Sequence, residues 1–236
     1  MLKPFFSYFG GKWRIAPKYP EPITDTVIEP FAGSAGYSLR YPDRQVILND
    51  LNPKVYETWR YLINASGDDI EALPVYDGTW ESTDELTHLP VGARYLMGWW
   101  MNKGTVAPAK SPSKWMRSGD PGCNYWGPGA RERIASQVGH IKHWKVVSCG
   151  YEQVPDIWGT WYVDPPYQQA GKPYPAQVMD FPALGRWCES RRGQVIVCEN
   201  VGATWLPFEP FVDAKANSSQ GVAKVSKEAI WYREAL

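Results

Sequence analysis

Short apolar runs alternate with amphipathic stretches along most of the chain, which is the pattern of strands and helices that follow one another. Buried strands are predicted at residues 26–30, 45–49, 145–148, 161–163 and 194–198, with two late strands near 211–213 and 228–232. Helices are predicted at residues 34–41, 53–65, 91–102, 130–141 and 181–191. Strand and helix in this order predict an α/β fold with a doubly wound, mostly parallel sheet.

The alternation is interrupted after residue 65. Up to about residue 127 there is one helical stretch, 91–102, followed by a run rich in Gly, Pro, Lys and Ser at 103–122. An irregular segment of this length inside a compact domain usually serves a function. We therefore predict one domain made of residues 1–65 and 142–236, into which residues 66–141 are inserted as a subdomain.

Composition narrows the class of protein without defining an activity. A chain of 236 residues, 44% hydrophobic and 21% charged, suits one α/β domain with an insertion. No apolar run is long enough to predict a membrane helix, and the first eight residues lack a signal-peptide core. The four cysteines and three histidines show neither Cys-x-x-Cys nor His-Glu-x-x-His spacing, so we expect reduced thiols, a cytoplasmic location and no metal site.

Charge is unevenly spread, although the net charge is zero. Residues 68–88 contain seven acids and no Lys or Arg, whereas residues 103–145 contain eight bases and two acids. A basic segment with interleaved aromatic rings favours a polyanionic partner, and chance clustering on a solvated surface is the alternative. The side chains predicted to contact such a partner are Lys103, Lys114, Arg117, Tyr125, Trp126 and Arg131, with Trp115 as a further stacking candidate.

The sequence Asp164-Pro165-Pro166-Tyr167 directly follows the apolar run 161–163. The Asp164 carboxylate and the Pro165 carbonyl can accept both N–H bonds of an exocyclic amine and turn its lone pair toward an electrophile. The prolines fix φ and hold the acceptors in place, and the Tyr167 ring can stack on a base taken out of a helix. An ordinary turn after a strand explains the same four residues.

A second candidate site follows the strand at 26–30. The turn from Glu29 to Gly36, Glu-Pro-Phe-Ala-Gly-Ser-Ala-Gly, lets a ligand approach the backbone at the carboxyl edge of a sheet. It lacks Gly-x-Gly-x-x-Gly, which favours a ligand without a pyrophosphate; a tight strand–helix connection is the alternative. Asp50 ends the next strand, where a carboxylate can bind both ribose hydroxyls of an adenosine or cap the following helix.

A third element, Gly10-Gly11-Lys12, lacks phosphate-loop spacing and no strand precedes it. Lys12 is therefore a candidate to bind a carboxylate, with Tyr8 packed nearby.

The order of these motifs resembles the Dam-type class of DNA adenine-N6 methyltransferases: Gly-Gly-Lys, Glu-Pro-Phe-x-Gly-x-x-Gly, Asn-Asp-x-Asn, then Asp-Pro-Pro-Tyr. The resemblance implies a sheet of the S-adenosylmethionine-dependent methyltransferase type, with residues 66–141 as an inserted DNA-recognition subdomain. It implies a cofactor site at Tyr8, Lys12, Phe31, Gly33, Ser34, Asp50 and Tyr151. It also implies a flipped adenine of double-stranded DNA at Asp164, Pro165, Pro166 and Tyr167. A bacterial or phage-infected cell, a role in restriction-modification and a monomer are favoured.

The implied reaction is direct transfer of a methyl group from the sulfonium to the amine, without a metal or a covalent enzyme intermediate. No Cys follows a proline, so the nucleophile of a cytosine-C5 methylase is missing. Two alternatives stay open. One is methylation of another amine or amide, such as cytosine N4, RNA or protein, and the other is a non-catalytic DNA-binding relative.

Overall fold

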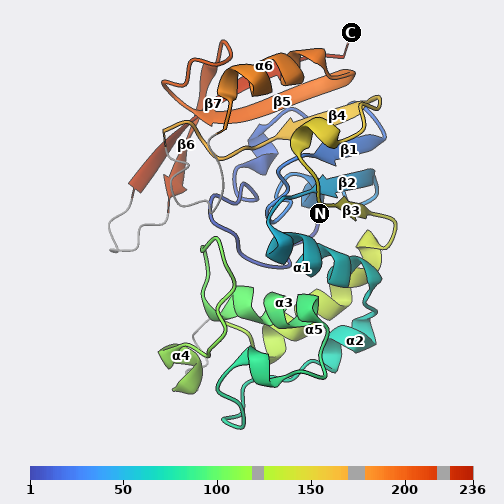
Figure 1. Cartoon of the computed structure of the whole chain (residues 1–236), viewed down its shortest axis with the longest axis vertical. Helices are drawn as coiled ribbons and strands as arrows, with labels where there is room; N and C mark the ends of the chain where they lie inside the picture. Colours follow the sequence, from blue (N-terminus) through green and yellow to red (C-terminus); the bar gives the residue numbers. More distant parts are fainter. Residues whose placement is uncertain (119–124, 170–178, 217–223, 236) are drawn as a thin grey trace.

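The computed structural model describes residues 1–118, 125–169, 179–216 and 224–235 (Figure 1). Seven strands of these residues form one sheet in the order β3-β2-β1-β4-β5-β7-β6. The strands are β1 (Thr26–Glu29), β2 (Gln45–Asn49), β3 (Lys145–Val147), β4 (Gly159–Val163), β5 (Gly193–Asn200), β6 (Glu209–Ala216) and β7 (Lys224–Arg233). The first five are parallel neighbours, and β7 runs antiparallel between β5 and β6. This arrangement confirms the predicted doubly wound, mostly parallel fold of the S-adenosylmethionine-dependent methyltransferase type.

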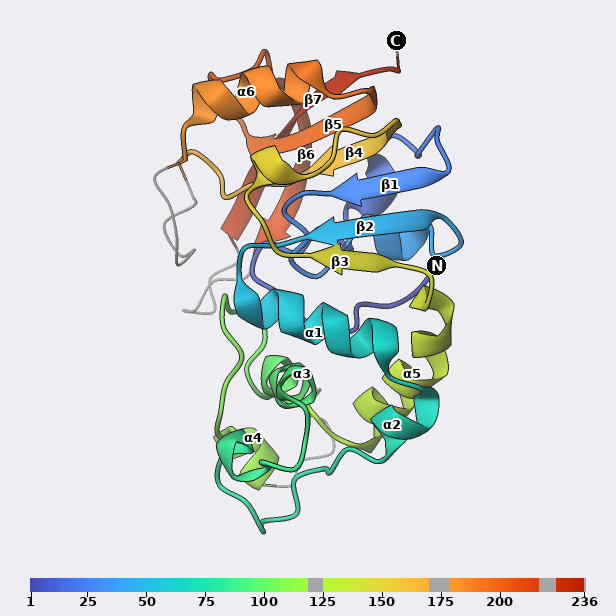
Figure 2. The same cartoon turned by 45° about the vertical axis from the view of Figure 1, so that its right-hand side comes forward.

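Helices lie near both edges of the sheet, and most of those beyond β3 belong to the insertion (Figures 1 and 2). The α-helices are α1 (Pro53–Asn64), α2 (Gly67–Glu71), α3 (Val91–Met101), α4 (Lys114–Arg117), α5 (Pro128–Val138) and α6 (Phe181–Ser190). Helix α6 lies along β5, whereas α1 connects the sheet to α3. The predicted strands and the helices at 53–65, 91–102, 130–141 and 181–191 are thus confirmed to within a few residues.

The helix predicted at 34–41 is wrong. Only a 3-10 turn, η2 (Ser38–Arg40), forms there. Gly33 and Ala35 adopt positive φ angles of 46° and 51°, which interrupt a right-handed helix. The segment is therefore an irregular, buried turn at the end of β1.

The insertion shares its hydrophobic core with the sheet domain. Phe6, from the N-terminal segment, stacks on Trp99 of α3 at 5.6 Å and also contacts Trp59 of α1 at 5.4 Å between ring centroids. The Trp100 indole donates a hydrogen bond to the Phe5 carbonyl at 2.7 Å. Residues 66–141 thus pack as an extension of the core, joined to it through the N-terminal segment.

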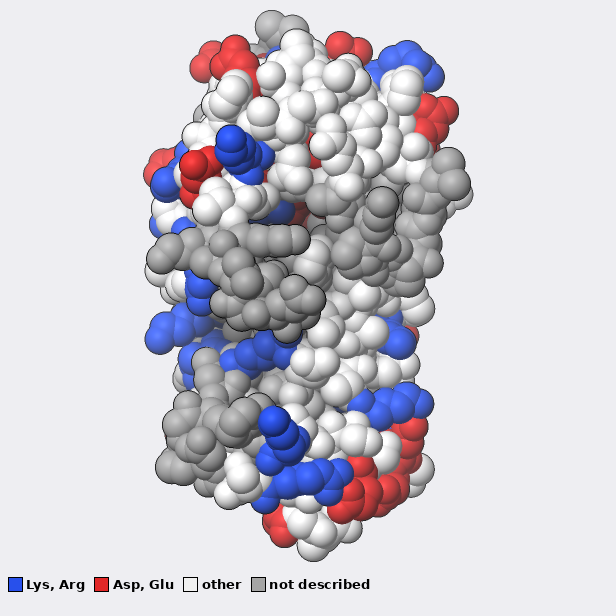
Figure 3. All heavy atoms as spheres, turned by 90° about the vertical axis from the view of Figure 1, so that its left-hand side faces the viewer, with Lys and Arg blue, Asp and Glu red and all other residues white. Residues whose placement is uncertain are grey.

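Basic side chains gather on the surface of the insertion, where Lys110 and Arg117 pair with acids of the segment 68–88. On the face shown in Figure 3, Lys and Arg gather over the lower half, where the insertion lies, and extend up to the sheet. Acidic side chains of the insertion lie at its lower margin. In the part of the chain that the structure describes, no helix is long and apolar enough to cross a membrane.

Candidate active site

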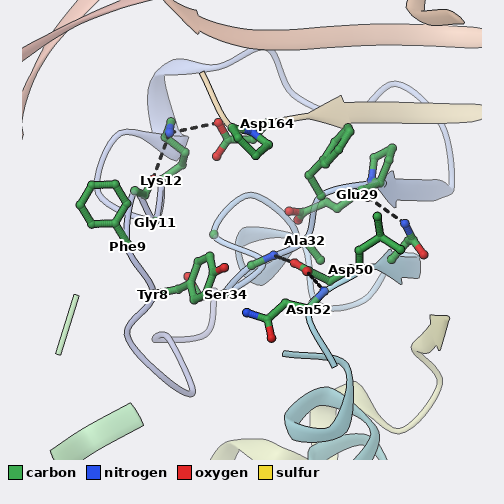
Figure 4. A pocket seen from close by; sticks show the side chains of 18 of the residues that line it. Tyr8, Phe9, Gly11, Lys12, Glu29, Ala32, Ser34, Asp50, Asn52 and Asp164 are labelled. Carbon is green, nitrogen blue, oxygen red and sulfur yellow. Dashed lines mark hydrogen bonds and ion pairs between the residues drawn. The ribbon is translucent and has the colours of Figure 1, made fainter. Parts of the chain in front are cut away.

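The carboxyl ends of β1, β2 and β4 open into a cavity of about 400 Å³ (Figure 4). Parallel strands end at the same edge, so residues that follow them meet there. The predicted residues that line the cavity are Tyr8, Lys12, Phe31, Gly33, Ser34, Asp50, Tyr151, Asp164 and Pro166. The structure therefore brings together side chains that lie up to 158 positions apart, from Tyr8 to Pro166.

Asp50 joins the ends of β1 and β2. One carboxylate oxygen accepts a hydrogen bond from the Gly33 amide at 2.9 Å, and the other accepts one from the Asn52 amide at 2.8 Å. Asn52, not Asp50, caps α1, because its side chain accepts a hydrogen bond from the Lys54 amide. Burial raises the pKa of Asp50 to about 6, which leaves the carboxylate mostly ionised at neutral pH. Each oxygen retains acceptor capacity toward the cavity.

Close packing fixes the turn that follows β1. A side chain at Gly33 would place its Cβ 2.9 Å from the Tyr8 ring, and the φ of 46° at Gly33 also favours glycine. The Trp59 indole donates to the Gly33 carbonyl at 2.8 Å. Tyr8 packs edge-on against Trp99 at 5.4 Å, so the insertion supports this wall of the cavity.

Asp164 faces the cavity from the end of β4 and pairs with Lys12 (Figure 4). The Lys12 ammonium lies 3.0 Å from an Asp164 carboxylate oxygen and donates to the Gly10 carbonyl at 3.0 Å. Burial raises the pKa of Asp164 to about 6, with Lys12 opposing the rise and Glu228 adding to it. Burial alone would lower the pKa of Lys12, but Asp164 and Glu228 outweigh it and raise that pKa. Lys12 thus pairs with the Asp164 carboxylate, and its predicted contact with the carboxylate of a ligand stays a prediction.

Two buried glutamates hold the turn that follows Asp164. The Tyr167 hydroxyl donates to Glu228 of β7 at 2.5 Å, and the Gln168 amide donates to Glu199 of β5 at 3.0 Å. The Lys12 ammonium lies 4.6 Å from the centre of the Tyr167 ring. Tyr167 packs against the core beside the cavity, and Pro165 is buried behind it. Neither glutamate was predicted from the sequence, although an acid inside an apolar strand, as in the run 194–199, is a usable signal.

An aromatic wall and a further buried acid complete the cavity. Phe31 contacts Tyr151 at 5.6 Å between ring centroids, and Tyr151 packs edge-on against Trp187 at 5.1 Å. Glu29 lies at the end of β1 and accepts a hydrogen bond from the Ser38 amide at 2.8 Å. Burial raises the pKa of Glu29 to about 8, so this carboxyl retains its proton at neutral pH. Sequence reasoning used Glu29 only as part of the turn motif.

The side chains predicted to contact a polyanion differ in their surroundings. Lys103 and Lys114 are exposed, whereas Tyr125 is half-buried. Arg117 pairs with Glu81 at 2.5 Å, and the Arg131 guanidinium donates to the Leu73 carbonyl at 2.9 Å. Residues 119–124 and the side chain of Trp115 lie outside the description.

Trp126 corrects the prediction that its ring contacts DNA. The side chain is 0% exposed, and its indole donates to the Pro74 carbonyl at 2.8 Å. The ring therefore belongs to the core of the insertion and offers no face to a base. Within the described ranges, no three His, Cys, Asp or Glu side chains are grouped to hold a metal ion.

Comparisons with known proteins place these motifs in a family. Residues 8–88 match the family model of the D12 class N6 adenine-specific DNA methyltransferases. The comparison with curated proteins finds no match. Two solved structures of the rRNA methyltransferase aviRa from Streptomyces viridochromogenes are 14% and 15% identical, each with a TM-score of 0.42. Their matches cover 98% of this chain and 88% and 87% of theirs.

A conserved hypothetical protein of Streptococcus pyogenes is 11% identical, with a TM-score of 0.36 and coverage of 94% and 92%. The family match spans the Gly-Gly-Lys, Glu-Pro-Phe and Asn-Asp motifs, which form three sides of the cavity. This match supports methyltransferase activity and confirms the predicted resemblance to the Dam-type family over residues 8–88.

Proposed function

We propose that the protein transfers a methyl group from S-adenosylmethionine to N6 of an adenine extruded from double-stranded DNA. One observation carries the proposal: Asp164 follows the end of β4 and lines the same cavity as the Gly33 turn and the Asp50 carboxylate. One cavity thus holds both an acceptor for an amine and a set of groups suited to a nucleoside.

The residues present fit S-adenosylmethionine. Asp50 has free acceptor positions for ribose hydroxyls, and the half-buried Phe31 ring beside Tyr151 supplies an apolar wall for a base. Lys12 uses two of its three N–H donors on Asp164 and Gly10, which leaves one for the carboxylate of the cofactor's amino-acid end. When bound, S-adenosylmethionine supplies a methyl group made electrophilic by its sulfonium.

The protein's own contribution is to orient the amine and to stabilise its charge. Asp164 accepts one N–H of the amine and the Pro165 carbonyl accepts the other, so the lone pair is free for in-line attack. Positive charge that develops on the nitrogen is stabilised by the Asp164 carboxylate, which is ionised above a pH of about 6. The Lys12 ammonium keeps that carboxylate ionised and aligned until the amine arrives.

Duplex DNA is the proposed substrate because the surface of the insertion is basic and because of the family match. Lys and Arg gather over the insertion on the face shown in Figure 3, which suits a duplex backbone. Lys103, Lys114 and Arg117 are exposed on the insertion and are proposed contacts, and Tyr167 is proposed to stack on the extruded adenine. The D12 class N6 adenine-specific match supports adenine as the target base.

Mass spectrometry of the product tests the proposal. Purified protein is incubated with S-adenosylmethionine carrying a labelled methyl group and with duplex DNA of varied sequence, RNA and a protein extract in parallel. Labelled N6-methyladenine in DNA is expected, and it should be absent with Asp164→Asn, which retains the shape of the side chain but not its charge. Label recovered only in N4-methylcytosine, RNA or protein would assign another substrate, and no label would indicate a non-catalytic relative.

A further inference from the structure

Trp100 of α3 holds two cations over its ring from different parts of the insertion. The Lys103 ammonium lies 4.5 Å from the ring centre, and the Arg133 guanidinium of α5 lies 5.1 Å from it. The indole N–H is fixed by its hydrogen bond to the Phe5 carbonyl at 2.7 Å. A buried ring that binds two cations through its π face organises a compact positive site.

Lys103 and Arg133 have no acidic partner among the residues that the structure describes, whereas neighbouring cations have one. Lys110 pairs with Asp84 at 2.7 Å, and Arg117 pairs with Glu81 at 2.5 Å. Among the ion pairs of the described residues, none involves Lys103 or Arg133. One terminal nitrogen of Arg133 is buried without a hydrogen-bond partner. A buried donor of this kind is costly unless a ligand completes it.

The pKa values of both Lys103 and Arg133 are lowered. Burial and the nearby Arg133 lower the pKa of Lys103 to about 8, and burial lowers the pKa of Arg133. Burial is the main cause of both shifts, and only the Lys103 shift includes repulsion by the neighbouring charge. An anion beside the two groups would favour their charged forms and oppose both shifts.

The site is joined to the wall of the cavity. The Gly104 amide donates to the Ser7 hydroxyl at 3.2 Å, and the Phe9 amide donates to the Thr105 carbonyl at 3.1 Å. Phe9 and the Gly-Gly-Lys residues after it line the cavity. Lys103 therefore directly precedes a segment that is hydrogen-bonded to the loop carrying Lys12.

We propose that Lys103 and Arg133 form a phosphate site that binds the backbone of the DNA duplex next to the base under reaction. The inference rests on the proposed function, because it takes duplex DNA as the ligand. A guanidinium and an ammonium together match a phosphodiester, since the fork of Arg binds two oxygens and Lys adds a point charge. Contacts of this kind fix the register of a duplex without reading its sequence.

The salt dependence of duplex binding tests the site, with variants that each remove one positive charge. Each neutralised phosphate contact contributes about 0.9 to the slope of log K against log salt. Lys103 and Arg133 share one phosphate, so the double variant Lys103→Gln/Arg133→Gln should reduce the slope by about 0.9, and each single variant should reduce it by less. Lys110→Gln removes the same charge from the same stretch but should leave the slope unchanged, because Asp84 already neutralises it.

Arg133→Lys serves as the variant that retains the charge, and it should keep the wild-type slope. Thermal melts followed by circular dichroism identify any variant that does not fold, and a misfolded Arg133→Gln is replaced by Arg133→Met in the comparison. A double variant with the wild-type slope overturns the phosphate site even if N6-methyladenine is produced. A wild type that binds the duplex with the expected slopes but leaves adenine unmethylated contradicts only the proposed function.

Discussion

The ammonium of Lys12 and the carboxylate of Asp164 lie 3.0 Å apart, so a residue of the cofactor motif and a residue of the amine motif form one ion pair. The pair is 8% and 19% exposed, which shields it from solvent while one side still faces the cavity. The charge state of Asp164 therefore depends on a residue 152 positions earlier in the chain.

Replacement of Asp164 by Ala should abolish methyl transfer but spare cofactor binding. The side chain is assigned to an acceptor that acts mainly on the developing charge, and loss of such a group costs on the order of 10²-fold or more in rate. Single-turnover rates give the loss, and calorimetry with S-adenosylmethionine is the control. Turnover within a few-fold of wild type would remove Asp164 from the reaction.

The rate should fall as the pH drops through about 6, because a protonated Asp164 can no longer accept a hydrogen bond on both oxygens. Lys12 lowers the pKa of Asp164, so Lys12→Gln should move this acid limb to higher pH. The measurement is kcat against pH at saturating cofactor, compared with Lys3→Gln on the exposed N-terminus. An acid limb that stays in place would show that Lys12 does not set the charge of Asp164.

Asp50→Ala should weaken the binding of S-adenosylmethionine rather than slow the chemical step. Its carboxylate ties the Gly33 turn to the start of α1 and also offers acceptors to a ribose. Asp50→Asn retains one acceptor oxygen and should lie between wild type and Ala. Calorimetric dissociation constants distinguish the two roles, because unchanged affinity in both variants would leave Asp50 a purely structural residue.

Tyr167→Phe should retain most activity, whereas Tyr167→Ala should bind DNA but lose most of kcat. Stacking on an extruded base contributes about 1–3 kcal/mol, and Phe retains the ring. A duplex with 2-aminopurine at the target reports extrusion through its fluorescence. Phe lacks the hydrogen bond to Glu228, and an unsatisfied buried acceptor costs about 1–3 kcal/mol, so a lower Tm is expected. Equal activity of the Ala variant would make Tyr167 a core residue only.

Glu29→Gln should stabilise the protein more at pH 8 than at pH 5. The pKa of Glu29 is about 8 in the folded protein and near 4.5 in the unfolded chain, so above pH 4.5 the unfolded state gains free energy by ionising. The wild-type free energy of unfolding therefore falls as pH rises from 4.5 to 8, and the variant lacks this loss. Calorimetric melts at several pH values measure the difference. If the free energies of unfolding of the wild type and the variant change in parallel with pH, Glu29 does not hold a proton in the folded protein.

The turn at residues 29–36, Asp50 and the Asp164 motif were predictable because each follows an apolar strand. Asp50 and Asp164 come directly after such runs, and parallel strands bring their ends together whatever lies between them. The contact between Tyr167 and Glu228 was not predictable, because it depends on β7 inserting antiparallel beside β5. No periodicity within a strand reports its position in a sheet.

The insertion was the least predictable part, for reasons of packing. Trp126 lies among glycines and bases in the sequence, but its ring is buried in the core and its indole donates to the Pro74 carbonyl. Arg117 appeared available to a polyanion, yet it pairs with Glu81 from the acidic segment. Segments that read as oppositely charged blocks thus partly neutralise each other once folded.

The N-terminal segment has a consequence for attempts to change what the insertion recognises. Phe5 and Phe6 lie against Trp100 and Trp99, so residues from outside the insertion complete its interior. A graft limited to residues 66–141 would arrive with two tryptophans facing foreign side chains. A transplantable unit would have to include the first residues of the chain together with residues 66–141. An exchange of specificity between this protein and its relatives should then require both segments to be exchanged together.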